Sequence, residues 1–478
     1  MNTIAANPAS ATHPTRTWEH IGFYLLVLLA AFSPPLFEYR GDFLTIFDLY
    51  LLAFLLVKIS TTGLAIAGTH WTTLATTFAV FLIYVTVGAL RVRTPGAFLL
   101  ALKQFEYAAF LLVLLDRHQR VSDDERSRDL WFLLLSLFFV ILYQIGFYYD
   151  ILPGIGDLRP PAQRRLGLPF MAGVSSNPAG VFLTAFVIVL FNLSVNMRRF
   201  ILPSALIGSL AIWALMLTGS RTNAAVLGVV LPLSALVAIW RTRFRWPVVA
   251  LVLTGVVLML TFGVDLLPED GSVGRITRML REPVSMLEEP SLTIRVDSWV
   301  AATDTWLSDA GSFFFGVGLG SLGATDGTVP RVLGELGIIG LALFLYVWYV
   351  HYLRFERSSI VVLLLLATLM NGIFAETLFV SFRTVQLYLL LLFLALQVQP
   401  GRVTGKVYQL RDLLSELKSF WYFVPAAAVL VPAFLLLFAG PAHQFSSVPF
   451  EAGIYAFAGA VIAALALLVT QRLRGARR

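Results

Sequence analysis

The chain contains no cysteine, and only 13% of its 478 residues are charged. The absence of cysteine excludes disulfide bonds, thiolate metal sites and thiol nucleophiles. The scarcity of charge excludes an ordinary soluble protein, in which charged residues make up about a quarter of the chain. Because 58% of the residues are hydrophobic, the composition indicates a membrane protein.

Long apolar runs follow one another from Ile21 almost to the C-terminus. A helix needs about 20 apolar residues to cross the hydrocarbon core of a bilayer. We therefore expect residues 1–478 to form one all-α, multi-pass membrane domain with about fourteen spanning helices. The predicted spans are 21–37, 43–57, 71–90, 97–115, 129–147, 178–194, 201–217, 224–240, 247–265, 335–352, 358–378, 384–399, 420–440 and 451–471.

The basic residues are divided unevenly between the two sides of these predicted spans. If the N-terminus is cytoplasmic, most of the 35 lysines and arginines fall on the inside, as is typical of cytoplasmic loops. We therefore predict that both termini lie inside, and we attribute the basic pI to membrane orientation, with no nucleic-acid partner. The predicted outer side carries two long segments, 148–177 and 266–334. Long structured loops are commonly functional, so we expect the site on the outer face.

The sequence "MLTGSRTNAAVLG", residues 216–228, places Arg221 in a short connection between two apolar runs. Snorkelling of the side chain towards water is one explanation. The connection is too short to reach far into water, however, and a charge at the membrane centre costs about 2.5 to 3.5 kcal/mol. The pattern therefore favours anion binding, with the hydroxyls of Thr218, Ser220 and Thr222 and backbone N–H groups at a helix start completing the pocket.

Three further arginines lie on the predicted outer side. Arg164 and Arg165 occur in "PPAQRRLGLPF", and Arg295 occurs in "SLTIRVDSWV". A solvated basic loop would explain the first two, and an ion pair with a nearby carboxylate such as Asp297 would explain the third. Together with Arg221 they indicate a dianionic ligand such as a pyrophosphate, because the planar guanidinium forms bidentate hydrogen bonds with phosphate.

Two patterns predict how the long segment 266–334 packs. Arg295, Trp299, Ala302 and Trp306 recur at helical spacing, which predicts a helix that lies against the bundle. The glycines of "FFFGVGLGSLG", residues 313–323, follow no predicted strand, so we do not expect a dinucleotide-binding loop. Instead, they allow close backbone packing where the chain re-enters the bundle.

Three carboxylates are candidates for a general base that activates a substrate hydroxyl. Asp326 and Glu335 follow the glycines, and Glu376 lies near the outer end of the eleventh predicted span. Simpler roles remain open, since Asp326 suits a turn and Glu335 suits the start of the tenth span, near a helix N-terminus. The sequence has no metal- or nucleotide-binding motif, so we expect neither a metal nor a cofactor.

Lys103 and Glu106 are charged residues inside the fourth predicted span. Their i, i+3 spacing places them on one helix face, where we expect them to neutralise each other towards the bundle interior. Asp48 in the second span is expected to be neutralised in the same way.

The motifs "RRLGLPF…SSNPAGVFL", "LTGSRTNAA", "SLTIRVDSWVAA" and "FGVGLGSLG…LGELGIIGLALF", in this order, resemble the O-antigen ligase/polymerase superfamily of bacterial inner membranes. The resemblance covers residues 97–399. It implies a GT-C-like, metal-independent glycosyltransferase bundle that uses an undecaprenyl-pyrophosphate-linked glycan on the periplasmic side. The family's pyrophosphate-binding arginines correspond to Arg221 and Arg295, and Arg165 is the closest match to a third. They would hold the donor and stabilise the departing diphosphate.

The chain departs from the ligases of this superfamily in one position. Those ligases carry a histidine after the glycine motif, whereas all six histidines of this chain lie outside 266–334. Asp326 occupies roughly the matching position. The resemblance therefore favours a polymerase of O-antigen, capsule or exopolysaccharide repeat units over a ligase that loads glycan onto lipid A-core. A flippase or other transporter of lipid-linked oligosaccharide is the alternative from another class.

A polymerase of this kind implies specific partners. The expected partners are the undecaprenyl-pyrophosphate-linked donor and acceptor glycans and membrane lipid, together with a chain-length regulator and a flippase.

Overall fold

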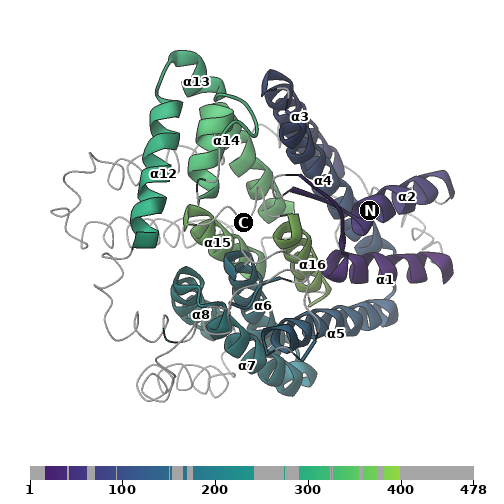
Figure 1. Cartoon of the computed structure of the whole chain (residues 1–478). Helices are drawn as coiled ribbons and strands as arrows, with labels where there is room; N and C mark the ends of the chain where they lie inside the picture. Colours follow the sequence, from purple (N-terminus) through teal and green to yellow (C-terminus); the bar gives the residue numbers. More distant parts are fainter. Residues whose placement is uncertain are drawn as a thin grey trace, which may run out of the picture.

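The computed structural model describes residues 17–39, 42–61, 70–92, 94–149, 151–152, 165–168, 176–241, 274, 290–322, 325, 327–354, 359–374 and 382–398. Three predicted spans, 247–265, 420–440 and 451–471, lie outside these residues. The described part is mostly helical (Figure 1). The all-α expectation is corrected at one place, where β1 and β2 form an antiparallel hairpin.

The elements follow one another along the chain as α1 (Thr17–Phe32), β1 (Pro35–Tyr39), β2 (Asp42–Thr45), α2 (Ile46–Thr61), α3 (His70–Val92), α4 (Pro95–Arg120), α5 (Asp123–Tyr148), α6 (Ser176–Asn196), η2 (Arg198–Phe200), α7 (Ile201–Thr218), α8 (Arg221–Arg241), α12 (Pro290–Trp306), α13 (Ala310–Phe315), α14 (Thr328–Arg354), α15 (Ser359–Phe374) and α16 (Phe382–Val398).

The helices have the length and composition of a membrane protein. Among the described residues, six helices are long and apolar enough to cross a bilayer, and they lie in α4, α5, α6, α7 with η2, α8 and α14. Shorter apolar stretches lie in α1, α3, α15 and α16. Each predicted span within the described residues overlaps one helix, but β1 occupies the end of the span 21–37 and β2 the start of the span 43–57. The first helix, however, ends at Phe32 because Pro34 and Pro35 cannot continue it.

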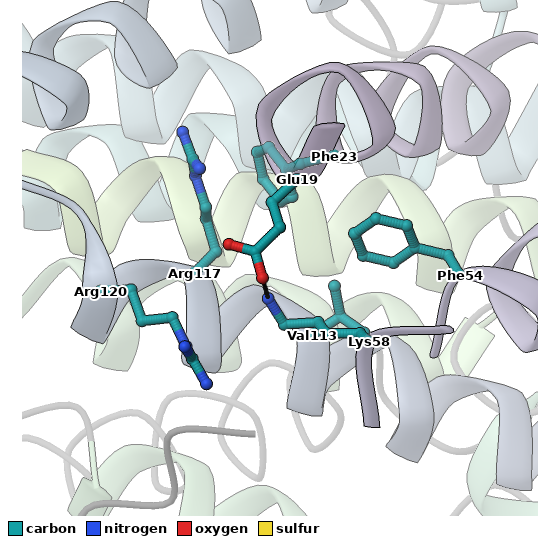
Figure 2. Close-up of a pocket in the computed structure, with 7 residues that line it drawn as sticks. All are labelled: Glu19, Phe23, Phe54, Lys58, Val113, Arg117 and Arg120. Atoms are coloured by element: carbon teal, nitrogen blue, oxygen red, sulfur yellow. Dashed lines mark ion pairs between the residues drawn. The ribbon is translucent and has the colours of Figure 1, made fainter. Parts of the chain in front are cut away.

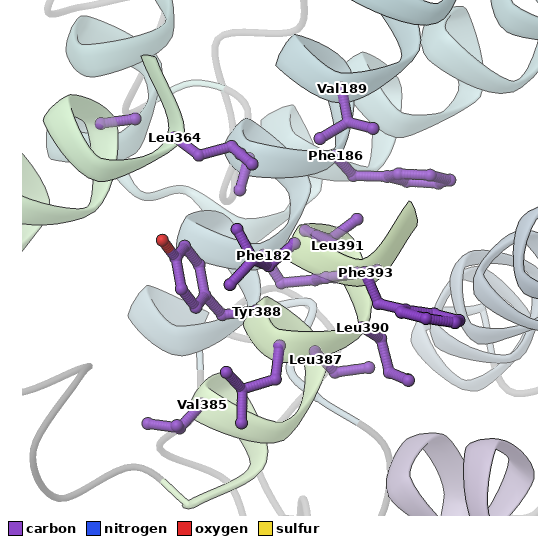
Figure 3. Close-up of a cluster of buried hydrophobic side chains, with 14 of the residues drawn as sticks. Phe182, Phe186, Val189, Leu364, Val385, Leu387, Tyr388, Leu390, Leu391 and Phe393 are labelled. Atoms are coloured by element: carbon purple, nitrogen blue, oxygen red, sulfur yellow. The ribbon is translucent and has the colours of Figure 1, made fainter. Parts of the chain in front are cut away.

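Helix α6 lies at the centre of the bundle. It packs against α7, α8, α15 and α16, and 94% of its apolar stretch is buried. Figure 3 shows Phe182 and Phe186 of α6 beside Leu364 of α15 and Phe393 of α16. Because the sequence of α6 is apolar on all sides, it suits a position surrounded by other helices.

Short polar sequences define where several helices begin. The Thr94 side chain accepts a hydrogen bond from the Ala97 N–H at 3.3 Å, and Pro95 occupies the first turn of α4. Ser122 and Glu125 form a capping box at the start of α5. These contacts satisfy N–H groups that have no partner within the helix.

Asp309 caps the start of the short helix α13, which lies in the predicted long segment 266–334. Its carboxylate accepts hydrogen bonds from the Ser312 hydroxyl at 2.7 Å and from the Ser312 N–H at 3.0 Å. These hydrogen bonds favour the charged form and hold the pKa of Asp309 below its ordinary value.

The predicted neutralisation of Lys103 inside the bundle is confirmed. The Lys103 ammonium lies 2.5 Å from the Asp48 carboxylate of α2 and 2.8 Å from the Glu106 carboxylate on its own helix, α4. The Gln386 amide of α16 donates a second hydrogen bond to Glu106 at 2.7 Å. This cluster joins three helices through groups that are nearly inaccessible to solvent.

Arg383, in the first turn of α16, extends this buried polar region to the end of α1. Its guanidinium donates to the Ala30 carbonyl at 2.9 Å and also to the Ser33 carbonyl. A cation at the C-terminus of a helix satisfies carbonyl groups that have no partner within it and complements the helix dipole. No pattern in the sequence indicates this role for Arg383.

Residues predicted on the same side of the membrane contact one another. On the predicted outer side, the Leu319 N–H donates to the Gly88 carbonyl and the Leu166 N–H donates to the Leu217 carbonyl; Gly88 and Leu217 lie at the outer ends of their predicted spans. Among those predicted inside, Lys58 pairs with Asp116 at 2.8 Å. We call the first end of the bundle the Arg221 end and the second the Lys58 end.

Candidate functional site at the Arg221 end

The turn between α7 and α8 places Arg221 at the first residue of a helix. Helix α7 ends at Thr218, and Gly219 adopts a left-handed conformation with a φ of 61°. Glycine suits this position because it has no Cβ to clash there. Helix α8 begins at Arg221, whose side chain is half-buried. The charge therefore lies beside backbone N–H groups at a helix N-terminus, a favourable place for an anion.

The neighbouring hydroxyls stabilise this turn from within. The buried Thr218 hydroxyl donates to the Leu215 carbonyl at 2.6 Å, and the buried Ser220 hydroxyl donates to the Asn177 side-chain oxygen at 2.9 Å. The prediction that both hydroxyls line the anion pocket is therefore corrected. Short hydroxyl side chains at a helix end commonly bond to nearby groups of their own chain. Thr222 is half-buried.

Asn223 links the start of α8 to the start of α6. Its amide nitrogen donates to the Ser220 hydroxyl at 2.7 Å and to the Asn177 carbonyl at 3.1 Å. Gly180 makes this contact possible, because a Cβ at that position would lie 2.4 Å from the Asn223 amide nitrogen. The turn that carries Arg221 is thus held against α6 by buried polar contacts.

Arg165 is next in sequence to Leu166, which contacts the end of α7 directly before this turn. The adjacent Leu166 donates its N–H to the Leu217 carbonyl at 3.0 Å, and the Gln144 amide of α5 donates to the Gly167 carbonyl at 2.8 Å. The Arg165 side chain is half-buried. The structure therefore brings the segments of Arg165 and Arg221 together, although they are far apart in the sequence.

Arg295 lies on α12, which packs against α14. Trp299, Ala302 and Trp306 are buried, which confirms the predicted packing face, and Arg295 is half-buried at its edge. The structure thus places Arg295 on a helix that packs against the bundle, and its place beside Arg165 and Arg221 stays a prediction.

The glycine-rich stretch packs against a break in α14. Gly337 interrupts the helix with a φ of 68°. At this break the carbonyls of Gly334 and Glu335 accept the N–H groups of Val317 and Gly318, each at 2.9 Å. A Cβ on Gly316 would lie 2.3 Å from the Glu335 carbonyl. The prediction that these glycines allow close backbone packing is confirmed.

The Glu335 carboxylate holds this stretch in place. It is fully buried, accepts the Gly320 N–H at 2.8 Å and accepts the Arg331 Nε–H at 3.1 Å. Glu335 does not open the helix, as the sequence suggested, because α14 already begins at Thr328. The i, i+4 spacing of Arg331 and Glu335 is a sequence signal that would have predicted their ion pair.

Arg91, at the end of α3, is a further arginine beside the glycine-rich stretch. Its side chain is exposed, and one guanidinium nitrogen donates to the Gly316 carbonyl at 2.9 Å. This contact ties the α3 end to the break in α14. The remaining candidates Asp326, Glu376 and Arg164 lie outside the described residues.

A pocket at the opposite, Lys58 end contains charges that pair with one another (Figure 2). Lys58 lies 3.5 Å from Glu19 and 2.8 Å from Asp116, and Arg120 lies 2.9 Å from Asp116. Arg117 also lines this pocket and forms two 2.8 Å contacts with the Asp129 carboxylate of α5. These pairs hold α1, α2, α4 and α5 together, so the pocket has a structural explanation.

Together these features define a multi-pass, mainly helical membrane protein. A group of polar residues around Arg221 lies at one end of its helical bundle. In the described residues, no group of three or more histidines or carboxylates could hold a metal ion. No protein-family model and no curated protein matches the chain. Its function must therefore be inferred from the residues at the Arg221 end.

Proposed function

We propose that this protein is a polymerase that joins undecaprenyl-pyrophosphate-linked repeat units into O-antigen, capsule or exopolysaccharide. The Arg221 end would face the periplasm of a bacterial cell, with the protein in the inner membrane. One observation carries the proposal: half-buried Arg221 begins a helix at the turn between two apolar helices, and the segment of half-buried Arg165 is hydrogen-bonded to the end of the first of them. Two arginines beside helical N–H groups suit a lipid-linked diphosphate.

The reaction requires only the energy of the donor's own leaving group. A hydroxyl of the acceptor sugar attacks the anomeric carbon of the donor, and the bond from that carbon to the diphosphate oxygen breaks. Arg165, Arg221 and Arg295 would hold the diphosphate and stabilise the charge that it gains as it leaves. A base accepts the proton of the attacking hydroxyl.

Asp326 is the first candidate for this base, and Glu376 is an alternative. Glu335 was a third candidate on sequence grounds. Its carboxylate already accepts hydrogen bonds from Arg331 and Gly320, so it better suits a role in positioning the glycine-rich stretch. A GT-C-like bundle is part of this proposal.

Transport of the lipid-linked glycan is the second candidate function. The specific observation in its favour is the break in α14 at Gly337, next to a buried ion pair. Discontinuous helices with polar groups at the break are common at the substrate sites of transporters. A purified protein that moved the lipid-linked glycan across a bilayer but joined no sugars would establish transport.

Deletion of the protein in its host separates the polymerase from its rivals. We expect the polymerase-deficient cell to accumulate single repeat units on undecaprenyl pyrophosphate at the periplasmic face and to lose longer chains. Loss of a ligase would instead leave long chains on the lipid carrier, unattached to lipid A-core. Loss of a flippase would leave single units at the cytoplasmic face. Mass spectrometry of lipid-linked glycans, with an assay of their sidedness, measures the difference.

A further inference from the structure

Asn371, in the last turn of α15, is a buried amide without a hydrogen-bond partner. Its side chain is 1% exposed, and neither its nitrogen nor its oxygen is hydrogen-bonded in the described part of the chain. Other buried amides of the described bundle, even those whose oxygen lacks a partner, form at least one hydrogen bond through their nitrogen. Asn192 donates to the Ile188 carbonyl, and Gln386 donates to Glu106. Because buried polar groups are nearly always paired, both free positions on Asn371 need an explanation.

The surroundings of Asn371 place it at the Arg221 end. A Cβ on the adjacent Gly372 would lie 3.6 Å from the Thr328 hydroxyl, so this end of α15 meets the start of α14. Helix α15 also packs along α6 and α8, and α8 begins at Arg221. Asn371 thus lies at the end of α15 that meets the start of α14, one turn before Arg331, on a helix that packs against the helix that begins at Arg221.

The chemistry of an amide limits what can bind to it. The amide offers a donor and an acceptor next to each other, so a fully satisfying ligand must accept one hydrogen bond and donate another. A sugar hydroxyl does both. A diphosphate oxygen only accepts, so it would leave the Asn371 oxygen unpaired.

We infer that Asn371 binds a hydroxyl of the sugar that is attached to the pyrophosphate in the donor. This inference rests on the proposed function, and it assigns Asn371 to the sugar and the arginines to the diphosphate. An apolar residue would fill the same space in a structural core without the cost of an unpaired polar group, so the unpaired amide points to a ligand.

The substitution Asn371→Leu in the full-length protein, reconstituted in nanodiscs, tests this inference. Two probes are used: undecaprenyl pyrophosphate without sugar, and the lipid-linked glycan extracted from cells that lack the protein. We expect the affinity for the glycan-bearing lipid to fall about tenfold or more, because the sugar loses its hydrogen bonds. The affinity for the sugar-free lipid is expected to change by less than about twofold, since the diphosphate contacts remain.

Stability measurements distinguish binding from a structural role. The Asn371→Leu protein without ligand should melt at the wild-type temperature or above, because the change removes an unpaired buried amide. The matched control is Asn192→Leu, which removes an amide that is already paired; it should melt earlier and still distinguish the two probes. Asn371→Asp retains the shape of the side chain but removes the donor, and it should also lose the preference for sugar.

The outcomes distinguish a failure of the inference about Asn371 from a failure of the proposed function. If both Asn371 variants prefer the glycan-bearing lipid as strongly as the wild type, the inference about Asn371 is wrong. If the wild-type protein binds neither lipid, the proposed function itself fails.

Discussion

Replacing Arg221 with alanine is expected to reduce polymer formation by about a hundredfold or more, the loss typical when one donor to a developing negative charge is removed. Arg221 begins α8 with a half-buried side chain, where it would stabilise the departing diphosphate. Arg221→Lys should recover only part of the activity, because an ammonium keeps the charge but cannot form the bidentate contact. The initial rate of the reconstituted protein and the polymer length in cells provide the measurement.

Arg199→Ala is the matched control for this prediction. Arg199 lies on η2, just before α7, its side chain is exposed, and its guanidinium contacts the Ser127 hydroxyl at 3.2 Å. Arg199 precedes α7, whereas Arg221 follows it. Arg199→Ala therefore removes an arginine from the opposite end of the same helix, and it should leave polymer formation unchanged. Normal polymer length in the Arg221→Ala variant would exclude Arg221 from the diphosphate site.

Replacing Lys103 with methionine is expected to lower the free energy of unfolding by about 3–5 kcal/mol, the cost typical of removing one partner of a buried ion pair. The change leaves the carboxylates of Asp48 and Glu106 without the ammonium that lies 2.5 and 2.8 Å from them. Denaturant unfolding in detergent micelles, followed by helical circular dichroism, measures the loss.

A compensated variant provides the control for Lys103. The triple change Lys103→Met, Asp48→Asn and Glu106→Gln removes both excess negative charges while retaining polar groups of similar shape. It should recover most of the lost stability. If Lys103→Met unfolds at the wild-type denaturant concentration, the buried cluster does not hold α2 and α4 together.

Local features of the sequence were sufficient to predict much of the bundle. Apolar runs predicted most helices within the described residues, but not α12 or α13. The spacing of Trp299, Ala302 and Trp306 predicted α12 and its buried face. The i, i+3 spacing of Lys103 and Glu106 predicted their contact. Each of these features depends on residues within a few turns of one another, where helical periodicity determines the neighbours.

The features that were not predicted depend on residues far apart in the chain. Arg383 caps the end of α1 through a hydrogen bond to Ala30 across 353 residues. The break at Gly337 exists because the glycine-rich stretch supplies N–H groups to carbonyls of α14. No periodic pattern encodes such pairings, since they result from how whole helices pack.

The Arg221 turn illustrates both cases. The sequence correctly indicated a charged residue at a helix end within an apolar region. It did not indicate that Thr218 and Ser220 bond within the protein, or that Asn223 fixes the turn to α6. The arginines and backbone N–H groups therefore remain the proposed contacts to the diphosphate, while the hydroxyls and Asn223 support the turn.

Reconstitution with a single defined substrate tests the central claim most directly. The purified full-length protein in liposomes would receive undecaprenyl pyrophosphate that carries one repeat unit, without nucleotide sugar and without added metal. The proposed mechanism predicts a ladder of products that differ by one repeat unit, with one undecaprenyl pyrophosphate released for each new glycosidic bond. Unchanged single units, in liposomes where the substrate is accessible at the Arg221 end, would contradict it.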